Sequence, residues 1–122
     1  MRILVVEDDD SVRQLTAAVL DKYGYRVTAV SSPSAAMAQV SQCNEAFDLL
    51  LSDVVMPGMN GFQATRKLNQ DPKTSSIPVI IITTKDQETD KIWGMRQGAV
   101  EYLVKPIREN DLVAKINAVM AD

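Results

Sequence analysis

Short apolar runs separated by amphipathic stretches make up most of this chain. Two of the runs, Ile3–Val6 and Val79–Ile82, are continuously apolar and rich in β-branched residues. Runs of this kind are typical of strands in a parallel sheet that is covered on both faces. Shorter or more mixed runs predict three further strands, at Arg26–Val30, Phe47–Leu51 and Tyr102–Val104.

Amphipathic segments lie between these runs and predict helices. The first helix has apolar or small residues at helical spacing, namely Val12, Leu15, Thr16, Val19 and Leu20. Gly24 is expected to close it, because glycine commonly ends a helix in the left-handed conformation. Pro33 is suited to the first turn of the second helix. The inner face expected for that helix consists of Ala36, Met37, Val40 and Cys43.

The second half of the chain predicts three more helices, at residues 61–68, 87–97 and 108–120. Gly98 is expected to stop the middle one. The inner face expected for the last one consists of Leu112, Ile116, Val119 and Met120.

Strand and helix alternate five times along the chain, which indicates an α/β fold with helices on both faces of a parallel sheet. We expect a doubly wound, five-stranded parallel sheet of order 2-1-3-4-5, which is the flavodoxin-like (βα)5 arrangement. In that order a ligand binds at the carboxyl ends of the strands, where the winding reverses between strands 1 and 3. Functional residues are therefore expected at the carboxyl ends of the strands.

Composition narrows what that chemistry can be. The chain has 122 residues, 46% hydrophobic and 24% charged, which suits one soluble domain spanning residues 1–122. It has no histidine, and this excludes Ser-His-Asp catalysis and the common zinc sites. The net charge of −3 disfavours nucleic-acid binding, which usually needs a basic surface.

The same inventory favours a cytoplasmic protein without membrane contact. No apolar run approaches the roughly 18 residues that a membrane span needs. The N-terminus, MRILVVEDDD, lacks the long apolar region and small-residue cleavage site of a signal peptide. Cys43 is the only cysteine, so no internal disulfide can form, as is usual in a reducing compartment.

Polar residues follow four of the expected strands at their carboxyl ends: Glu7–Asp9, Ser52–Asp53, Thr83–Lys85 and Lys105–Pro106. Carboxylates about 4 Å apart repel by roughly 4 kcal/mol at an effective dielectric constant near 20, so such a cluster needs protonation or a cation. Hard oxygen donors without His or Cys favour Mg²⁺, with Mn²⁺ as a substitute. A carboxylate beside Mg²⁺ can act as the nucleophile in phosphoryl transfer.

Four segments together resemble response-regulator receiver domains over essentially the whole chain. They are ILVVEDD at 3–9, LLLSDVVMPGMNG at 49–61, PVIIITT at 78–84 and GAVEYLVKP at 98–106. The resemblance implies that Asp53 is the phosphoacceptor and that the Lys105–Pro106 bond is cis. The other implied roles are metal ligation by Glu7, Asp8, Asp53 and the backbone carbonyl of Val55, phosphate binding by Lys105, and switching by Thr83 and Tyr102.

The function implied by the resemblance is a phosphorelay switch. A sensor histidine kinase or small phosphodonor would phosphorylate Asp53, Thr83 would move inward, and Tyr102 would turn from exposed to buried. The face made by the helices at 87–97 and 108–120 and the strand at 102–104 would then change its affinity for a downstream protein partner. The chain would catalyse only its own phosphorylation and dephosphorylation, as a monomer or weak dimer.

Two parts of the chain resemble different receivers. The segment from Asn60 onward is most similar to stand-alone regulators of twitching motility and chemosensory systems. The first half is more similar to receivers attached to hybrid histidine kinases. A divergent natural protein and an engineered recombinant of two parents both fit this pattern. A receiver that serves as a non-switching scaffold is a third alternative.

Other classes of function fit the residues less well. A haloacid-dehalogenase-type phosphatase normally has a second acid two residues after its nucleophile, where this chain has Val55. A flavodoxin-like FMN carrier needs a phosphate loop rich in Ser, Thr or Gly, where this chain has acids after Val6.

Trp93 and Met95 fit either a partner surface or simple packing. The resemblance also predicts slow self-dephosphorylation, because Thr84 stands where a smaller residue is common in the family, and Val55 and Lys85 offer no acid or amide to orient an attacking water.

Overall fold

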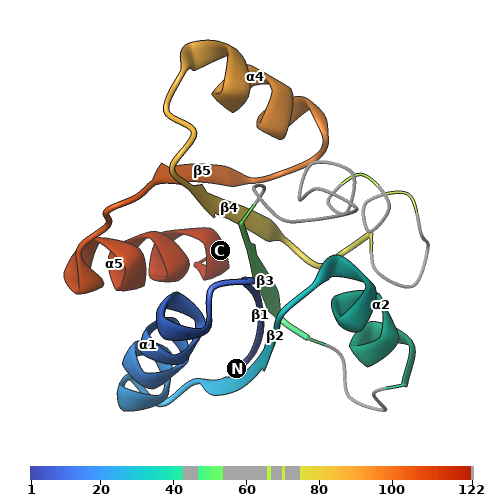
Figure 1. Ribbon diagram of the computed structural model, residues 1–122, viewed down its shortest axis with the longest axis vertical. Coiled ribbons are helices and arrows are strands. Elements are labelled where there is room, and N and C mark those ends of the chain that lie inside the picture. The colour runs from blue at the N-terminus through green and yellow to red at the C-terminus, as the bar shows by residue number, and fades with distance from the viewer. Residues whose placement is uncertain (43–46, 54–65, 67–69, 71–74, 122) are drawn as a thin grey trace.

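A parallel sheet forms the centre of the molecule (Figure 1). The computed structural model describes residues 1–42, 47–53, 66, 70 and 75–121. Neighbouring strands are all parallel, and their order is β2-β1-β3-β4-β5, as predicted. The strands are β1 (Arg2–Val6), β2 (Arg26–Val30), β3 (Leu49–Ser52), β4 (Val79–Thr83) and β5 (Glu101–Val104).

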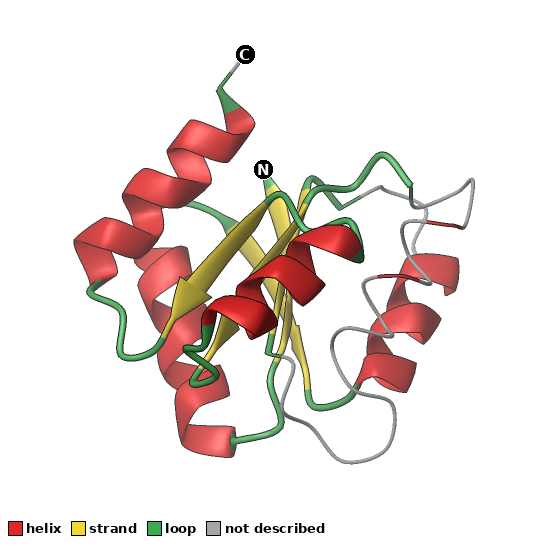
Figure 2. Ribbon diagram, turned by 90° about the horizontal axis from the view of Figure 1, so that it is seen from above, coloured by secondary structure: helices red, strands yellow, loops and turns green. Residues whose placement is uncertain are grey.

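Helices flank the sheet on both sides (Figure 2). The described helices are α1 (Asp10–Lys22), α2 (Pro33–Gln42), α4 (Glu88–Arg96) and α5 (Glu109–Met120). Gly24 and Gly98 follow α1 and α4 with φ of 89° and 108°, so both glycines supply the left-handed conformation expected of them. The helix predicted at 61–68, apart from Arg66, and the inward position predicted for Cys43 lie outside the described residues. No helix in the described ranges is long and apolar enough to cross a membrane.

The strands bury alternate residues on opposite faces, which explains why they are continuously apolar. One face of the sheet packs against α1 and α5, and this core consists of Ile3, Val5, Leu20, Leu49, Leu51, Ile80, Ile82, Leu103, Leu112 and Ile116. The other face packs against α2, and that core consists of Leu4, Val6, Ala36, Phe47, Leu50 and Val79. A third cluster lies next to α4 and consists of Ile81, Ala99 and Tyr102. Consecutive residues of a strand therefore belong to the cores on opposite faces of the sheet.

One position in the apolar pattern of α1 does not lie in the core. Leu20 is fully buried, but Leu15 is 66% exposed, although both share the helical spacing. Leu15 borders a surface groove together with Thr84 and Pro106, at the edge of the contact between α1 and the segment after β5. The apolar stripe of α1 is therefore wider than the surface that the sheet and α5 cover.

Candidate functional site

The carboxyl ends of the strands meet at one edge of the sheet, where backbone hydrogen bonds extend β1, β3 and β5 by one residue each. The amide of Asp53 donates to the carbonyl of Val6 at 3.1 Å, and the amide of Lys105 donates to the carbonyl of Thr83 at 2.7 Å. The amide of Glu7 donates to Val30 at 3.0 Å. These bonds hold Glu7, Asp53 and Lys105 at the same edge of the sheet, as the strand-end rule predicts.

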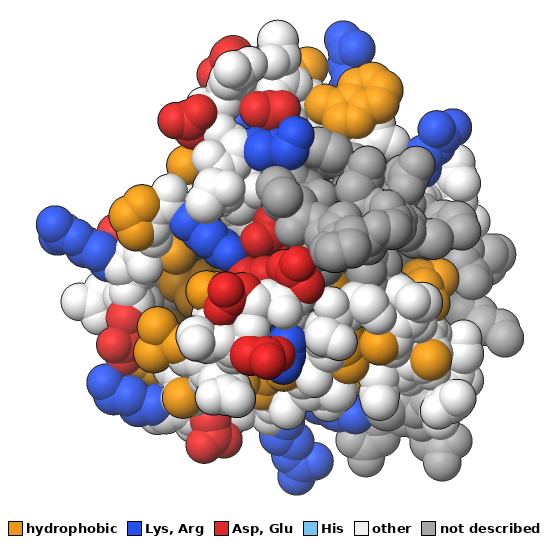
Figure 3. Space-filling model, in the orientation of Figure 1, with side chains coloured by type: hydrophobic (Ala, Val, Ile, Leu, Met, Phe, Trp, Pro, Cys, Tyr) orange, Lys and Arg blue, Asp and Glu red, His pale blue; other side chains and the backbone are white. Residues whose placement is uncertain are grey.

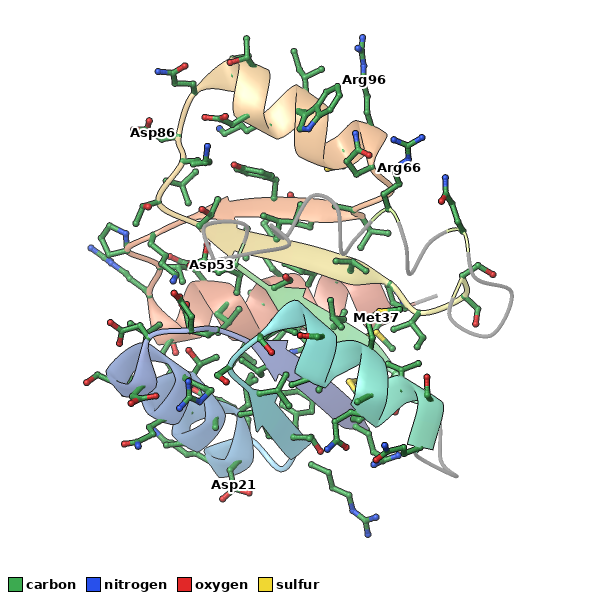
Figure 4. All side chains as sticks on the ribbon, turned by 45° about the vertical axis from the view of Figure 1, so that its right-hand side comes forward. Asp21, Met37, Asp53, Arg66, Asp86 and Arg96 are labelled. Carbon is green, nitrogen blue, oxygen red and sulfur yellow. The ribbon has the colours of Figure 1, made fainter. Side chains whose placement is uncertain are left out.

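Lys105 joins the two buried carboxylates of this edge. Its Nζ donates to Asp53 Oδ2 at 2.9 Å and also to Glu7 Oε1. Asp53 is 9% exposed and Glu7 4% exposed, while the Lys105 side chain is 20% exposed. Figure 4 shows Asp53 at the end of the central strands, and Figure 3 shows acidic side chains gathered near the middle of the corresponding surface. The site is an acidic recess with a lysine as its internal cation.

The charges at this site are set by burial and by the three-residue contact. Burial raises the pKa of Glu7, the hydrogen bond from Lys105 opposes that rise, and the nearby negative charge of Asp53 adds to it. Burial lowers the pKa of Lys105, but its bonds to Glu7 and Asp53 outweigh that effect and the net pKa is raised. Lys105 therefore stays charged at neutral pH, and the carboxylates depend on a nearby cation.

The three-carboxylate cluster predicted from the sequence is only partly formed. Glu7 and Asp53 meet at Lys105, but Asp8 is exposed, and no set of three His, Cys, Asp or Glu side chains within the described residues is arranged to hold a metal. Val55, whose carbonyl was the fourth predicted ligand, lies outside the described residues. The donors that are present still fit Mg²⁺, which usually takes one or two carboxylates and completes its shell with water and phosphate oxygens.

Thr83 and Tyr102, the predicted switch residues, converge on the backbone of Lys85. Thr83 is fully buried, and its Oγ1 accepts a hydrogen bond from the Lys85 amide at 3.3 Å. The Tyr102 hydroxyl donates to the Lys85 carbonyl at 3.0 Å. Burial, with smaller contributions from Asp90, Asp53 and Asp86, raises the pKa of Tyr102 to about 12. The ring of Tyr102 is thus already held inward, as a neutral phenol, against the loop after β4, whereas the switch implied by the resemblance starts from an exposed ring.

Two features of the site, the contact of Arg13 and the backbone junction at Lys85, were not predicted from the sequence, and the alternatives left open for Trp93 and Met95 are now decided. Arg13 donates from Nη1 to the carbonyl of Glu7 at 3.0 Å, which ties α1 to the end of β1. The backbone junction at Lys85 has no side-chain signature, so no motif could reveal it. Trp93 is 53% exposed and Met95 is also exposed, so these α4 residues do not pack in the core.

The Lys105–Pro106 bond is cis, as the family resemblance implies.

Comparison with known sequences identifies the kind of domain that has this geometry. Residues 3–117 match the family model of the response regulator receiver domain. The chain is 52% identical over 120 residues to protein PilH of Pseudomonas aeruginosa, and the match covers 98% of both chains. It is 38% identical over 120 residues to the phosphate regulon transcriptional regulatory protein PhoB of Escherichia coli, of which it covers 51%. The chain therefore spans about half the length of PhoB and almost all of PilH.

Solved structures agree with these matches. The chemotaxis protein CheY4 of Vibrio cholerae superposes with a TM-score of 0.90 at 29% identity, covering 98% of both chains. The receiver domain of the sensor histidine kinase PA1611 of Pseudomonas aeruginosa superposes with a TM-score of 0.86 at 27% identity, covering 96% of this chain and 94% of the other. That PA1611 structure has a magnesium ion coordinated in its active-site cleft.

Proposed function

This chain belongs to the response regulator receiver family, the phosphorelay switches of two-component signalling, and we propose that Asp53 is its phosphoacceptor. The observation that supports this proposal best is the contact between the nearly buried Asp53 carboxylate and Lys105 Nζ at 2.9 Å. A carboxylate in that position lies next to the positive charge of Lys105. It can therefore attack phosphorus while a cation is ready to bind the phosphoryl oxygens.

The transfer step uses residues of this edge of the sheet. An Asp53 oxygen attacks the phosphorus of a phosphohistidine on the sensor kinase, or of a small acyl phosphate. The new P–O bond forms as the bond to the leaving nitrogen or oxygen breaks, and the leaving group keeps that electron pair. Lys105 then donates a hydrogen bond to an oxygen of the transferred phosphoryl group. The negative charge of that oxygen thus lies next to the Lys105 ammonium. The chain thus acts only on itself, as a switch rather than a turnover enzyme.

Glu7, Asp8, Asp53 and the Val55 carbonyl are the residues that would hold Mg²⁺, or Mn²⁺ in its place. When bound, the ion would offset the negative charge of the phosphoryl oxygens and of the acidic recess. The role of Glu7 and Asp8 does not require both to contact the ion directly, since Mg²⁺ keeps several waters. Asp8 is exposed beside Glu7 and is therefore accessible to such a hydrated ion.

The signal would leave the site through Thr83 and Tyr102 toward the surface of α4, β5 and α5. Both side chains already share the backbone of Lys85, so a shift of Thr83 toward a phosphorylated Asp53 changes the support of the Tyr102 hydroxyl. The exposed apolar residues on this side, including Ile92, Trp93 and Met95, suit contact with a downstream protein. We place this exchange between kinase and partner in the cytoplasm, without nucleic acid or membrane and with the chain as a monomer or weak dimer.

The proposal is tested by phosphorylation of purified protein with an acyl phosphate and Mg²⁺, followed by intact-mass measurement. We expect the wild type to gain a hydroxylamine-sensitive phosphoryl group and Asp53→Asn to gain none. Asp21→Asn is the matched control, because Asp21 is exposed near the end of α1, away from the site (Figure 4). If Asp53→Asn is labelled like the wild type, another residue is the acceptor. If the wild type is not labelled by any donor, the scaffold alternative is correct.

A further inference from the structure

Helix α4 crosses the ring of Tyr102 at a glycine. Gly94 is buried in the middle of α4, and Tyr102, Ile81 and Ala99 form the cluster beneath it. A Cβ added at Gly94 would lie 2.8 Å from Tyr102 Cδ2 and 3.0 Å from Tyr102 Cε2. Carbon atoms do not approach so closely without repulsion. The inward ring of Tyr102 therefore occupies the space that a side chain at residue 94 would need.

The backbone gives no other reason for glycine at this position. Among the described residues, the glycines with positive φ are Gly24 and Gly98, so residue 94 has a conformation open to any residue. Glycine in a helix interior is unfavourable relative to alanine, because it loses more backbone freedom on folding. The close packing of the Tyr102 ring, with Ile81 Cδ1 beside it, is what favours glycine at this contact.

The two neighbours of this position differ in their ability to move. Ile81 Cδ1 lies 3.0 Å from the added Cβ, but it is the end of a flexible side chain and can rotate away. The Tyr102 ring is planar and rigid, and its hydroxyl is bonded to the Lys85 carbonyl. A shift of the ring away from residue 94 would disturb that bond, whereas rotation about χ1 toward solvent would clear the space for the new side chain.

We propose that Gly94 is a positioning residue that keeps open the inward site of Tyr102 and so sets the balance between the inward and outward rings. This inference rests on the proposed switch function, because only a switch gives the ring position a consequence for signalling. A methyl group at residue 94 makes the inward state costly and leaves the outward state unaffected. Any ligand of Asp53 that favours the inward ring then binds more weakly, because it must also overcome that cost.

The direct test is ¹⁹F NMR of protein labelled with 3-fluorotyrosine. The chain has three tyrosines, and Tyr102→Phe assigns the signal of Tyr102. We expect Gly94→Ala to move most of the Tyr102 signal to the position of an exposed fluorotyrosine. Thr89→Ala, at an exposed position on the same helix, should leave the signal unchanged. A Tyr102 signal that stays in its wild-type position in folded Gly94→Ala would overturn the proposal.

A double-mutant cycle keeps the proposal testable even if Gly94→Ala folds poorly. In urea denaturation Gly94→Ala should destabilise the wild type but stabilise Tyr102→Ala, because the ring is gone and alanine is the better helix residue. Equal effects in the two backgrounds would show that the ring is not what requires glycine. Neither this cycle nor the NMR measurement involves Asp53, so both readouts stand apart from the phosphorylation test.

The consequence for the switch is measured by titration with beryllofluoride and Mg²⁺. We expect Gly94→Ala to bind beryllofluoride about three- to tenfold more weakly than wild type. The apparent affinity falls in proportion to the fraction of molecules with an inward ring, and we expect that fraction to fall to about a third to a tenth. If the wild type is phosphorylated on Asp53 and Gly94→Ala binds beryllofluoride equally well, Gly94 has no part in the switch. If Asp53 is not the acceptor but the ring still moves outward in Gly94→Ala, the proposed function fails and the packing role of Gly94 remains.

Discussion

Lys105→Met removes the charge that joins the two buried carboxylates while keeping a long apolar side chain. In the wild type, Lys105 Nζ donates to both Glu7 and Asp53. Without it, two carboxylates that are each nearly buried lose this counter-charge. The variant should therefore be less stable without a metal and should bind Mg²⁺ more tightly, because the ammonium competes with the metal for the same oxygens.

The size of both effects follows from the geometry. Removing one partner from a fully buried ion pair costs about 3–5 kcal/mol. Because the Lys105 side chain is 20% exposed, we expect about 2 kcal/mol. Two unit charges about 4 Å apart interact by about 4 kcal/mol at an effective dielectric constant near 20, and a divalent ion doubles that value. If Lys105 swings toward solvent and keeps only about a fifth of that repulsion, its removal still tightens Mg²⁺ binding roughly tenfold.

The assay combines calorimetric titration with Mg²⁺ and urea denaturation with and without the metal. At 100 times its dissociation constant, Mg²⁺ adds about 2.7 kcal/mol to the stability of the folded state, so it should bring Lys105→Met slightly above the stability of the metal-free wild type. Lys115→Met is the matched control, since Lys115 is half exposed and pairs with Glu101 at the start of β5, the end of the strand away from the site. It should leave Mg²⁺ affinity unchanged.

The result that would refute this reasoning is an Mg²⁺ affinity of Lys105→Met equal to, or weaker than, that of Lys115→Met. It would mean that the ammonium does not compete with the metal and that the contacts of Lys105 with Glu7 and Asp53 are compatible with a bound ion. A tighter Mg²⁺ affinity without loss of metal-free stability would instead separate the two effects. It would show that solvent already compensates the carboxylates when Lys105 is absent.

Three other predictions follow from features described above. Ile116→Ala should lower the free energy of unfolding by about 2–5 kcal/mol in urea denaturation, because Ile116 is fully buried, whereas Leu15→Ala should change it by less than about 1 kcal/mol. Tyr102 has its pKa raised to about 12, so the stability contributed by its neutral phenol is present below about pH 10 and is lost as pH rises through about 12. Wild type should therefore lose stability more steeply than Tyr102→Phe in that window, and equal slopes would contradict this. Thr84→Ala and Lys85→Glu should each speed hydrolysis of the phosphorylated protein, and unchanged rates would show that these side chains do not limit access of water.

The fold could be predicted from the sequence because the strands are buried on both faces. Runs such as Ile3–Val6 and Val79–Ile82 fit no other element of that length, and the structure extends each run by a single residue. The prediction for Arg26–Val30 matches β2 at both ends. The exposure of Leu15 could not be foreseen, because helical spacing fixes a direction but not how far the neighbouring elements reach.

The residues of the candidate site could be predicted to meet, but not all of their contacts could be. Strand ends share one edge in a parallel sheet, so the proximity of Asp53 and Lys105 follows from topology alone. The bond from Lys105 to Glu7 depends on the path of one side chain across that edge. The contact between Gly94 and Tyr102 depends on the height and angle at which α4 crosses β5. Neither leaves a periodic or spaced signal in the sequence.

The convergence of Thr83 and Tyr102 on the backbone of Lys85 separates two properties that a protein engineer would want to adjust independently. Both hydrogen bonds use main-chain atoms of residue 85, and its side chain takes no part in either. The identity of that side chain can therefore be varied while both hydrogen bonds, and with them the proposed path to α4, are kept. Proline is the exception, because it lacks the amide hydrogen that Thr83 accepts. A library at position 85 would thus measure how this side chain affects the lifetime of the phosphorylated state while the two hydrogen bonds stay the same.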